Sequence, residues 1–493
     1  MRRDLLIAGV LGAVAVAVSA TGSGTASLWG DEAASVLSAE RSFPSLAVMA
    51  QHVDAVHTLY YAALHVWIGL AGASPFAVRF PSAAAVGVAV AGVVLLGQRL
   101  RGLRFGILAG VIAMVLPRLT DVGSEARSYA FTAAIAVVLT LLVTVQLKAA
   151  APRRRIWIAY AAVLALGTLL FLWLALVALS HLVVLALARR EAVRAWVVGF
   201  AAAMVAASPV LVFAVLERGQ VAYLATRQSF DVTALFVTPW FENPWVAIGL
   251  WPLMIGGIAL AVRDWLTARR RWQVPSPSSS TALLPVAWML LPSVTLIAGS
   301  AAIAVYTPRY LAMCTPAVAF LAALPLDALL AERRRALTGI AGIALLAVVV
   351  LIAPTWAQQR TPYAKNNSDW AVISAELGAH AHAGDAVAFD DTVRPSRRTR
   401  LALRTYPAGF AGLDDVTLET PWYDTTNWYD ATYTLGQAQA LGRLDGVTRL
   451  WLVEYALPGH VDTDGIATAS AAGFREATTI STHRSSIIEF TRG

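Results

Sequence analysis

The feature that most constrains this sequence is a series of long apolar runs separated by short clusters of arginine. The run at 80–97, for example, is followed by Arg99, Arg101 and Arg104. Hydrophobic residues make up 58% of the chain and charged residues only 14%, whereas about a quarter of the residues of a soluble globular protein are charged. The composition therefore excludes a soluble globular protein and predicts a polytopic α-helical membrane protein.

The apolar runs predict about eleven transmembrane helices. The run at 156–188 has basic clusters at both ends and would be roughly 50 Å long as one helix, so it is interpreted as a hairpin of two shorter helices. With this choice every arginine triplet lies on the same side as the N-terminus, as the positive-inside rule requires. The other predicted spans are 5–20, 80–97, 105–117, 129–147, 196–216, 245–262, 283–305, 311–330 and 337–354.

The first external loop, 22–78, contains an apolar segment that does not fit a simple span. Counting 59–70 as a crossing would place the later arginine clusters outside, so we expect two helices of this loop to lie at the membrane interface. The preceding segment, 5–20, follows Arg2 and Arg3 and is read as a retained signal anchor. A cleaved signal peptide, with cleavage near 20–27, is the alternative.

The basic charge does not require nucleic acid as a partner. The formal net charge is +8, but the arginines are grouped between apolar runs, where they encode membrane orientation. Lys148 and Lys365 are the only lysines, and this bias together with abundant alanine is typical of a high-GC bacterium. Cys314 is the only cysteine, so an intrachain disulfide is excluded.

The composition changes after residue 355, and 356–493 is predicted to be a soluble, extracytoplasmic α/β domain behind the transmembrane domain 1–355. A helix capped by Ser368 or Asp369 and a turn at 384–385 precede a short strand at 386–389. Further strands are expected at 448–454 and 485–490, with a helix at 466–473 between them. The domain shows no metal-ligand spacing, phosphate loop or nucleophile elbow.

Polar residues in three external loops are predicted to lie on one face of the membrane domain. They are Asp31 and Glu32 in the first loop, Asp121, Glu125 and Arg127 in a later loop, and Tyr306 with Arg309 in the last. Guanidinium groups bind phosphate through paired hydrogen bonds, and a carboxylate can accept a proton from an attacking hydroxyl. The combination favours transfer of a group from a lipid phosphate.

Several segments, in order, resemble the bacterial GT-C glycosyltransferases of the protein-mannosyltransferase and undecaprenyl-phosphate-sugar transferase group. They are WGDEA at 29–33, VDAVHTLYYAALHVW at 53–67, FAVRFPSA at 76–83, SEARSYAF at 124–131, PRYLAMCTPAVAFLAAL at 308–324 and SDWAVISAELGAHAHAGDAV at 368–387. The resemblance implies a GT-C fold and an inverting glycosyltransferase of the plasma membrane. Its active site and C-terminal domain would be extracytoplasmic.

The resemblance also implies roles for individual residues. Asp31 matches the general base of the family, Glu125 and Arg127 match its E-A-R-x-Y motif, and Arg309 matches its P-R-Y arginine. The family's H-P-P-L-Y-Y segment is Val-His-Thr-Leu-Tyr-Tyr at 56–61 in this chain. It lacks the prolines, and its histidine is one position closer to the tyrosines, so the match of His57 to the family histidine is weaker. The candidate substrate-binding residues are Glu32, His57, Tyr60, Tyr61, Asp121, Glu125, Arg127, Tyr129, Tyr306, Arg309 and Tyr310.

The implied partners are a polyprenyl-phosphate-sugar donor, membrane lipids and a glycan, lipoglycan or protein acceptor. Mannose is the preferred sugar, because the resemblance and the high-GC bias together suggest an actinobacterial envelope, and arabinofuranose is the alternative. No metal site is predicted, although the family allows a divalent cation at Asp31 and Glu125. A flippase for lipid-linked sugars or a non-catalytic scaffold would have a similar hydropathy pattern.

Each candidate residue also has a purely structural interpretation. Asp31 would be a favourable N-cap for a helix that begins near Ala33. Glu125 and Arg127 would form an ordinary interfacial ion pair. Arg309 would extend its side chain to lipid phosphates.

Overall fold

The computed structural model describes residues 2–149, 153–270, 281–332, 334–456 and 463–493. Arg271, Arg333 and the serine-rich segment at 275–280 lie outside these ranges. The chain forms two compact units, and each is described by itself. The first contains residues 1–21, 55–60 and 79–358, and the second contains 22–54, 61–78 and 359–493.

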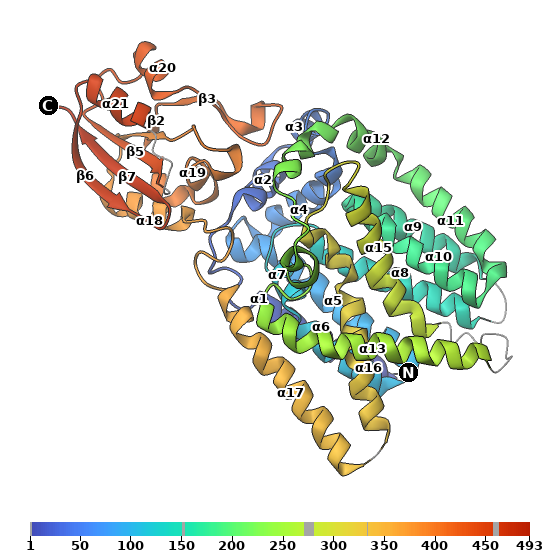
Figure 1. Cartoon of the computed structure of the whole chain (residues 1–493). Coiled ribbons are helices and arrows are strands. Elements are labelled where there is room, and N and C mark those ends of the chain that lie inside the picture. Colours follow the sequence, from blue (N-terminus) through green and yellow to red (C-terminus); the bar gives the residue numbers. More distant parts are fainter. Residues whose placement is uncertain (1, 150–152, 271–280, 333, 457–462) are drawn as a thin grey trace. The chain divides into compact units, whose positions relative to one another are not determined.

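The first unit is built almost entirely of helices (Figure 1). Short 3-10 turns join several of them, and a π-helical turn, η5, covers Thr233–Val237. The helices are α1 (Arg2–Ala20), α5 (Pro75–Arg101), α6 (Leu103–Val115), α7 (Pro117–Val122), α8 (Tyr129–Lys148), α9 (Arg154–Leu170), α10 (Val177–Ala188), α11 (Val193–Ala206), α12 (Ser208–Leu216), α13 (Pro244–Arg270), α15 (Leu284–Gly299), α16 (Thr315–Ala331) and α17 (Arg335–Gln358).

Each predicted span corresponds to one of these helices or to a bent pair. Among the described residues, six helical segments are long and apolar enough to cross a membrane, and a seventh is the pair α11 and α12, bent by 59°. Four shorter helices, α6, α9, α10 and α15, match the remaining predicted spans. The predicted polytopic α-helical membrane protein is therefore confirmed.

The predicted hairpin at 156–188 is present as α9 and α10. The helical hydrogen-bond pattern breaks at Phe171, whose backbone is extended with φ −161° and ψ 108°. A 3-10 turn, η2 (Leu172–Leu176), then leads into α10. The chain thereby avoids a single 33-residue helix that would be longer than the hydrocarbon core of a bilayer.

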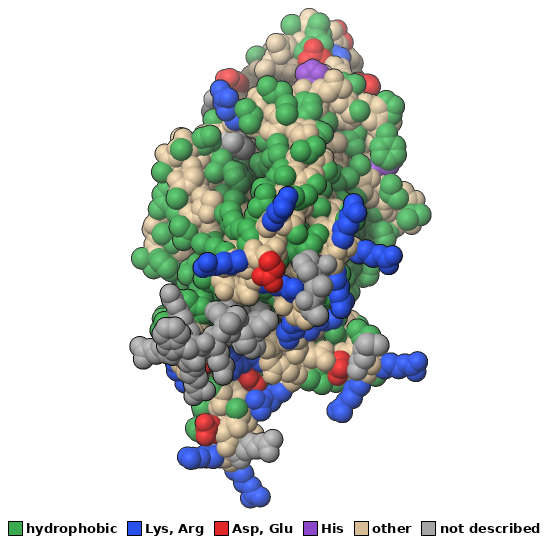
Figure 2. Space-filling view, turned by 90° about the vertical axis from the view of Figure 1, so that its right-hand side faces the viewer, with side chains coloured by type: hydrophobic (Ala, Val, Ile, Leu, Met, Phe, Trp, Pro, Cys, Tyr) green, Lys and Arg blue, Asp and Glu red, His purple; other side chains and the backbone are tan. Residues whose placement is uncertain are grey.

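The helix ends that carry basic residues meet at one end of the first unit. Arg101 at the end of α5 pairs with Asp264 of α13 at 3.0 Å, and Arg104 of α6 pairs with Asp327 of α16 at 2.7 Å. Arg189, which follows α10, donates a hydrogen bond to the carbonyl of Gln146 near the end of α8 at 2.8 Å. Figure 2 shows Lys and Arg side chains gathered in the lower part of a broad hydrophobic surface.

Helix α16 forms the centre of the first unit. Its residues 317–323 are fully buried and pack in one hydrophobic core with α6, α13 and α15. The contact with α13 needs a glycine, because a Cβ at Gly257 would lie 2.8 Å from the carbonyl carbon of Leu321. Small residues commonly allow such close backbone approach between membrane helices.

A buried hydrogen-bond chain joins α8, α9, α10 and α11. The Trp196 indole N–H donates to the Tyr160 hydroxyl at 3.2 Å, and the Tyr160 hydroxyl lies 2.9 Å from His181 Nδ1. His181 Nε2 lies 3.1 Å from the Thr140 hydroxyl, which itself donates to the carbonyl of Ala136. Every donor finds an acceptor if His181 is neutral with its proton on Nε2.

Replacement of Tyr160 by Phe is expected to destabilise the first unit by about 1 kcal/mol, because the Trp196 N–H loses its acceptor and His181 loses its donor. Thermal unfolding of the purified protein in detergent measures this loss. The double variant with His181→Phe should lose less than the sum of the two single variants. Strictly additive losses would contradict the hydrogen-bond chain.

The second unit contains a mixed five-stranded sheet with the order β2-β1-β5-β7-β6, in which β1 is parallel to β2 and β5, and β7 is antiparallel to β5 and β6. The strands are β1 (Ala386–Phe389), β2 (Asp414–Asp415), β5 (Arg449–Tyr455), β6 (Arg475–Ser481) and β7 (Ser485–Thr491). Strands β3 (Leu418–Thr420) and β4 (Ala431–Thr432) form a separate antiparallel pair. The helices are α2 (Gly30–Glu40), α3 (Phe43–Met49), most of α4 (Thr58–Ala71), α18 (Trp370–His380), α19 (Leu401–Thr405), α20 (Leu435–Ala440) and α21 (Thr463–Ala471).

Alternate strand residues of the sheet enter two different cores, as the period of two in a strand requires. Val387, Trp451 and Ile487 pack with α18 and α19, and also with Ala33 and Leu37 of α2. The opposite face packs against α20 and α21. The predicted C-terminal α/β domain is therefore present, and α2 from the first loop belongs to its core.

Candidate functional site

In the first unit, Arg309 and Glu125 form the ion pair at the centre of the predicted polar cluster. Arg309 lies in the 3-10 turn η7 (Pro308–Cys314), which packs against the start of α8. Its guanidinium is 3.7 Å from Glu125 Oε1 and 5.7 Å from the centre of the Tyr129 ring. The Glu125 side chain is only 4% exposed, whereas that of Arg309 is 28% exposed. The arginine is thus held from one side and accessible from another.

Tyr129, beside this ion pair, is part of an aromatic cluster. Tyr129, Tyr310 and Phe171 contact each other with ring centres 5.2 to 6.1 Å apart. Tyr129 and Phe171 also belong to the main hydrophobic core, and Tyr310 packs against it. The ion pair of Arg309 and Glu125 therefore lies next to aromatic side chains that are packed in or against the main core.

Three other predicted residues of the first unit are buried. Arg127 follows Glu125 in a tight turn, in which its N–H donates to the Glu125 carbonyl at 2.9 Å. Tyr60 contacts Phe131 edge to face with ring centres 6.1 Å apart. His57 lies in the 3-10 turn η1 (Ala55–His57) and is 8% exposed.

Asp121 takes part in a different interaction, with an arginine that the sequence did not single out. Arg118 pairs with Asp121 at 3.2 Å and with Glu242 at 2.9 Å. It also donates to the carbonyls of Thr238 and Pro239. The Arg118 side chain is 5% exposed, so this buried cation ties the segment after η5 to α7.

Tyr306 contacts η5 itself, just before the segment that Arg118 holds. Its hydroxyl donates to the carbonyl of Ala234 at 2.6 Å, and its ring stacks on Phe230. Burial raises the pKa of Tyr306 to about 12, with Arg118 acting in the opposite direction. The hydroxyl therefore stays protonated at neutral pH and remains a hydrogen-bond donor.

The variant Arg118→Ala is expected to destabilise the first unit by about 2–4 kcal/mol, because two carboxylates lose a buried partner. Thermal unfolding in detergent and limited proteolysis between 217 and 243 measure the effect. Arg263→Ala serves as the control, since Arg263 is 68% exposed and its pair with Asp264 contributes little. Equal unfolding midpoints for the two variants would contradict this role for Arg118.

In the second unit, Asp31 and Glu32 lie in the first turn of α2. The N-cap of this helix is Trp29, and the Asp31 carbonyl accepts a hydrogen bond from the Ser35 hydroxyl at 3.0 Å. The interpretation of Asp31 as the N-cap of a helix starting near Ala33 is therefore wrong. Glu32 is fully buried, whereas Asp31 is partly exposed.

Tyr61 also belongs to the second unit. Its hydroxyl donates to the Asp54 carboxylate, which accepts a second hydrogen bond from the Trp428 indole N–H at 3.0 Å. Asp54 has φ +58°, a left-handed conformation that Asp tolerates better than most residues. The Tyr61 hydroxyl is thus already engaged in a contact that joins the first loop to the sheet domain.

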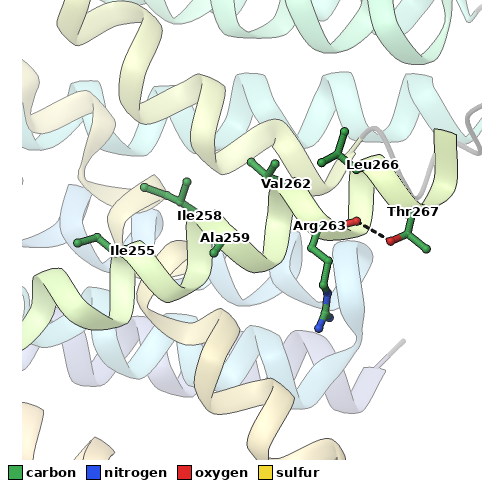
Figure 3. Close-up of a pocket in the computed structure, with 7 residues that line it drawn as sticks. All are labelled: Ile255, Ile258, Ala259, Val262, Arg263, Leu266 and Thr267. Atoms are coloured by element: carbon green, nitrogen blue, oxygen red, sulfur yellow. Dashed lines mark hydrogen bonds between the residues drawn. The ribbon is translucent and has the colours of Figure 1, made fainter. Parts of the chain in front are cut away.

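No group of three or more His, Cys, Asp or Glu side chains with metal-binding geometry occurs among the described residues. A shallow hollow runs along one face of α13, lined by Ile255, Ile258, Ala259, Val262, Arg263, Leu266 and Thr267 (Figure 3). The hydroxyl of Thr267 donates to the Arg263 carbonyl at 2.8 Å, so it is satisfied within the helix. An apolar surface on a single helix is typical of lipid contact, and none of the predicted site residues lines it.

Known proteins resemble this chain in structure. No family model matches the sequence, and no curated protein sequence matches it. The apo crystal structure of ArnT from Cupriavidus metallidurans superimposes with a TM-score of 0.55 at 12% identity, over 97% of both chains. The same protein bound to undecaprenyl phosphate gives a TM-score of 0.54 at 13% identity, again over 97% of both chains.

A second similar structure is the oligosaccharyltransferase AglB from Archaeoglobus fulgidus, in complex with an inhibitory peptide and a dolichol-phosphate. Its TM-score is 0.52 at 9% identity, over 97% of this chain and 74% of AglB. This chain has a GT-C fold. The helical first unit and the sheet of the second unit are both included in the match, because nearly the whole chain is covered.

Proposed function

We propose that this protein is an integral membrane glycosyltransferase that moves a sugar from a polyprenyl-phosphate donor to an acceptor hydroxyl. The observation that carries the proposal is the match over 97% of both chains with ArnT, which has been determined with undecaprenyl phosphate bound. The partly exposed Arg309, supported by Glu125 and Tyr129, adds a guanidinium suited to a phosphate.

In the proposed mechanism Asp31 accepts the proton of the acceptor hydroxyl, whose oxygen attacks the anomeric carbon of the donor sugar. The bond between that carbon and the phosphate oxygen breaks, and the configuration inverts. Arg309 and Arg127 offset the negative charge that grows on the departing polyprenyl phosphate. Glu32, His57, Tyr60, Tyr61, Asp121, Tyr129, Tyr306 and Tyr310 complete the proposed substrate-binding set.

We further propose an extracytoplasmic active site in the plasma membrane, with the sheet domain on the same side. This orientation keeps the arginine clusters in the cytoplasm, as the positive-inside rule requires. Mannose is the proposed sugar and arabinofuranose its competitor. A glycan, a lipoglycan or a protein is the proposed acceptor.

Membranes that contain the protein should transfer label from a radiolabelled polyprenyl-phosphate sugar into a product, and parallel reactions with mannose and arabinofuranose donors identify the sugar. Label that crosses the membrane but stays on the lipid would instead indicate a flippase. Envelope glycans of a deletion strain then identify the acceptor.

The variant Asp31→Asn is expected to reduce kcat by about 100- to 10,000-fold, which is the usual contribution of a general base. The amide has nearly the same shape as the carboxylate, so the thermal unfolding midpoint should stay the same. Transfer near the wild-type rate by the purified variant would remove Asp31 from this role.

The variant Arg309→Ala is expected to raise the KM for the lipid donor by about tenfold or more, because a charge-assisted hydrogen bond to phosphate is lost. The KM for the acceptor should change much less. Initial rates measured over a matrix of donor and acceptor concentrations separate the two effects. A donor KM equal to that of the wild type would show that Arg309 does not contact the donor.

A further inference from the structure

One loop of the sheet domain contacts α2 in both the first and the last turn of the helix. This loop, residues 421–430, joins β3 to β4 and is called the strap here. The Tyr429 hydroxyl donates to the carbonyl of Gly30 in the first turn of α2 at 3.4 Å. The Trp422 indole N–H donates to the carbonyl of Leu37 in its last turn at 3.1 Å. The strap therefore holds α2 along its length.

The strap is itself held by a buried cation. Arg41, which follows α2 directly and is 1% exposed, donates to the carbonyl of Thr425 at 2.9 Å and to the carbonyls of Trp422 and Asn427. Burial lowers the pKa of Arg41 to about 10, and Asp424 acts in the opposite direction. The guanidinium thus stays charged at neutral pH. Three strap carbonyls converge on it, so the loop and the end of α2 are fixed together.

The residues before Asp31 are fixed by other parts of the same domain. The Leu28 N–H donates to the Tyr406 hydroxyl at 2.8 Å, and the Leu28 carbonyl accepts from the Ser368 hydroxyl at 2.6 Å. Gly30 packs directly on the loop after β1, where a Cβ would lie 2.6 Å from the Ser396 Cβ. The backbone on the N-terminal side of Asp31 therefore has little freedom to move.

We propose that the sheet domain positions the catalytic base, with Trp422, Tyr429 and Arg41 as positioning residues that act through α2. This inference rests on the proposed function, because it takes Asp31 as the base. A general base must be held within hydrogen-bond reach of the proton it accepts, and an error of about 1 Å can reduce the rate by about a hundredfold. The sheet domain thereby becomes part of the catalytic machinery.

The test uses the full-length protein with both hydrogen bonds to α2 removed, in the double variant Trp422→Phe, Tyr429→Phe. The control is Tyr423→Phe. Like Tyr429→Phe it removes a tyrosine hydroxyl from the strap, but Tyr423 is 46% exposed. Hydrogen exchange of residues 30–40 reports on α2, kcat and the donor KM report on transfer, and the thermal midpoint reports on global folding.

The double variant is expected to exchange the α2 amides about fivefold faster or more, as the loss of a hydrogen bond predicts. Its kcat should fall by about tenfold or more while the donor KM stays unchanged, because the base and not the donor site is displaced. Tyr423→Phe should match the wild type in all readouts. If kcat falls while the thermal midpoint stays the same, a general loss of stability does not explain the lower rate.

Two results would overturn the proposal. One is faster exchange in α2 with unchanged kcat, which would show that the strap stabilises the helix without positioning the base. The other is unchanged exchange in α2. A wild-type protein without any transfer would refute the proposed function itself, and the assignment of positioning residues with it, so the two failures are distinguishable.

Discussion

The packing of α2 into the sheet domain is the contact on which the arrangement of the candidate carboxylates Asp31 and Glu32 depends. Ala33 and Leu37 are one helical turn apart, and both are completely buried in the same core as Trp370 and Trp451. This spacing turns one face of α2 toward the sheet and fixes the rotation of the helix about its axis. The direction in which the partly exposed Asp31 points then follows from the position of the apolar side chains of Ala33 and Leu37.

Arg118 and Arg309 of the first unit differ in how far their side chains are exposed. Arg118 contacts two carboxylates and two backbone carbonyls and is almost completely buried. Arg309 pairs with Glu125 at 3.7 Å, and its side chain is 28% exposed. A guanidinium at an accessible face is suited to binding an anion, whereas a buried one held by carboxylates and carbonyls serves to hold loops. The difference separates a binding role from a structural one among residues of the same type.

Much of the fold could be predicted because long apolar runs and short buried strands are recognisable in the sequence itself. The runs of the first unit and the buried strands β1, β5 and β7 were found at nearly their observed positions. Strand β6 was not predicted, since it lies at the sheet edge and its residues, such as Thr478 and Thr479, are mostly exposed. Its strand conformation comes from pairing with β7 and not from an apolar pattern of its own.

The candidate site was predicted less completely, because contacts between distant residues leave no local signal. Arg118 precedes Asp121 by one helical turn, yet its partner Glu242 is more than a hundred residues away. The strap was missed for the same reason, since nothing near residue 422 indicates a bond to Leu37. A cap of α18 by Ser368 or Asp369 was predicted, and Asp369 is the N-cap residue, but its side chain does not bond to the helix. Its carboxylate accepts from the backbone N–H of Arg484 and the Thr482 hydroxyl.

The burial of Cys314 has a practical consequence for experiments on this protein. It is the only thiol in the chain and is completely buried within the main core, out of reach of reagents in water. The natural sequence therefore behaves as a cysteine-free background toward membrane-impermeant maleimides. Single cysteines introduced into loops would report their side of the bilayer without further engineering.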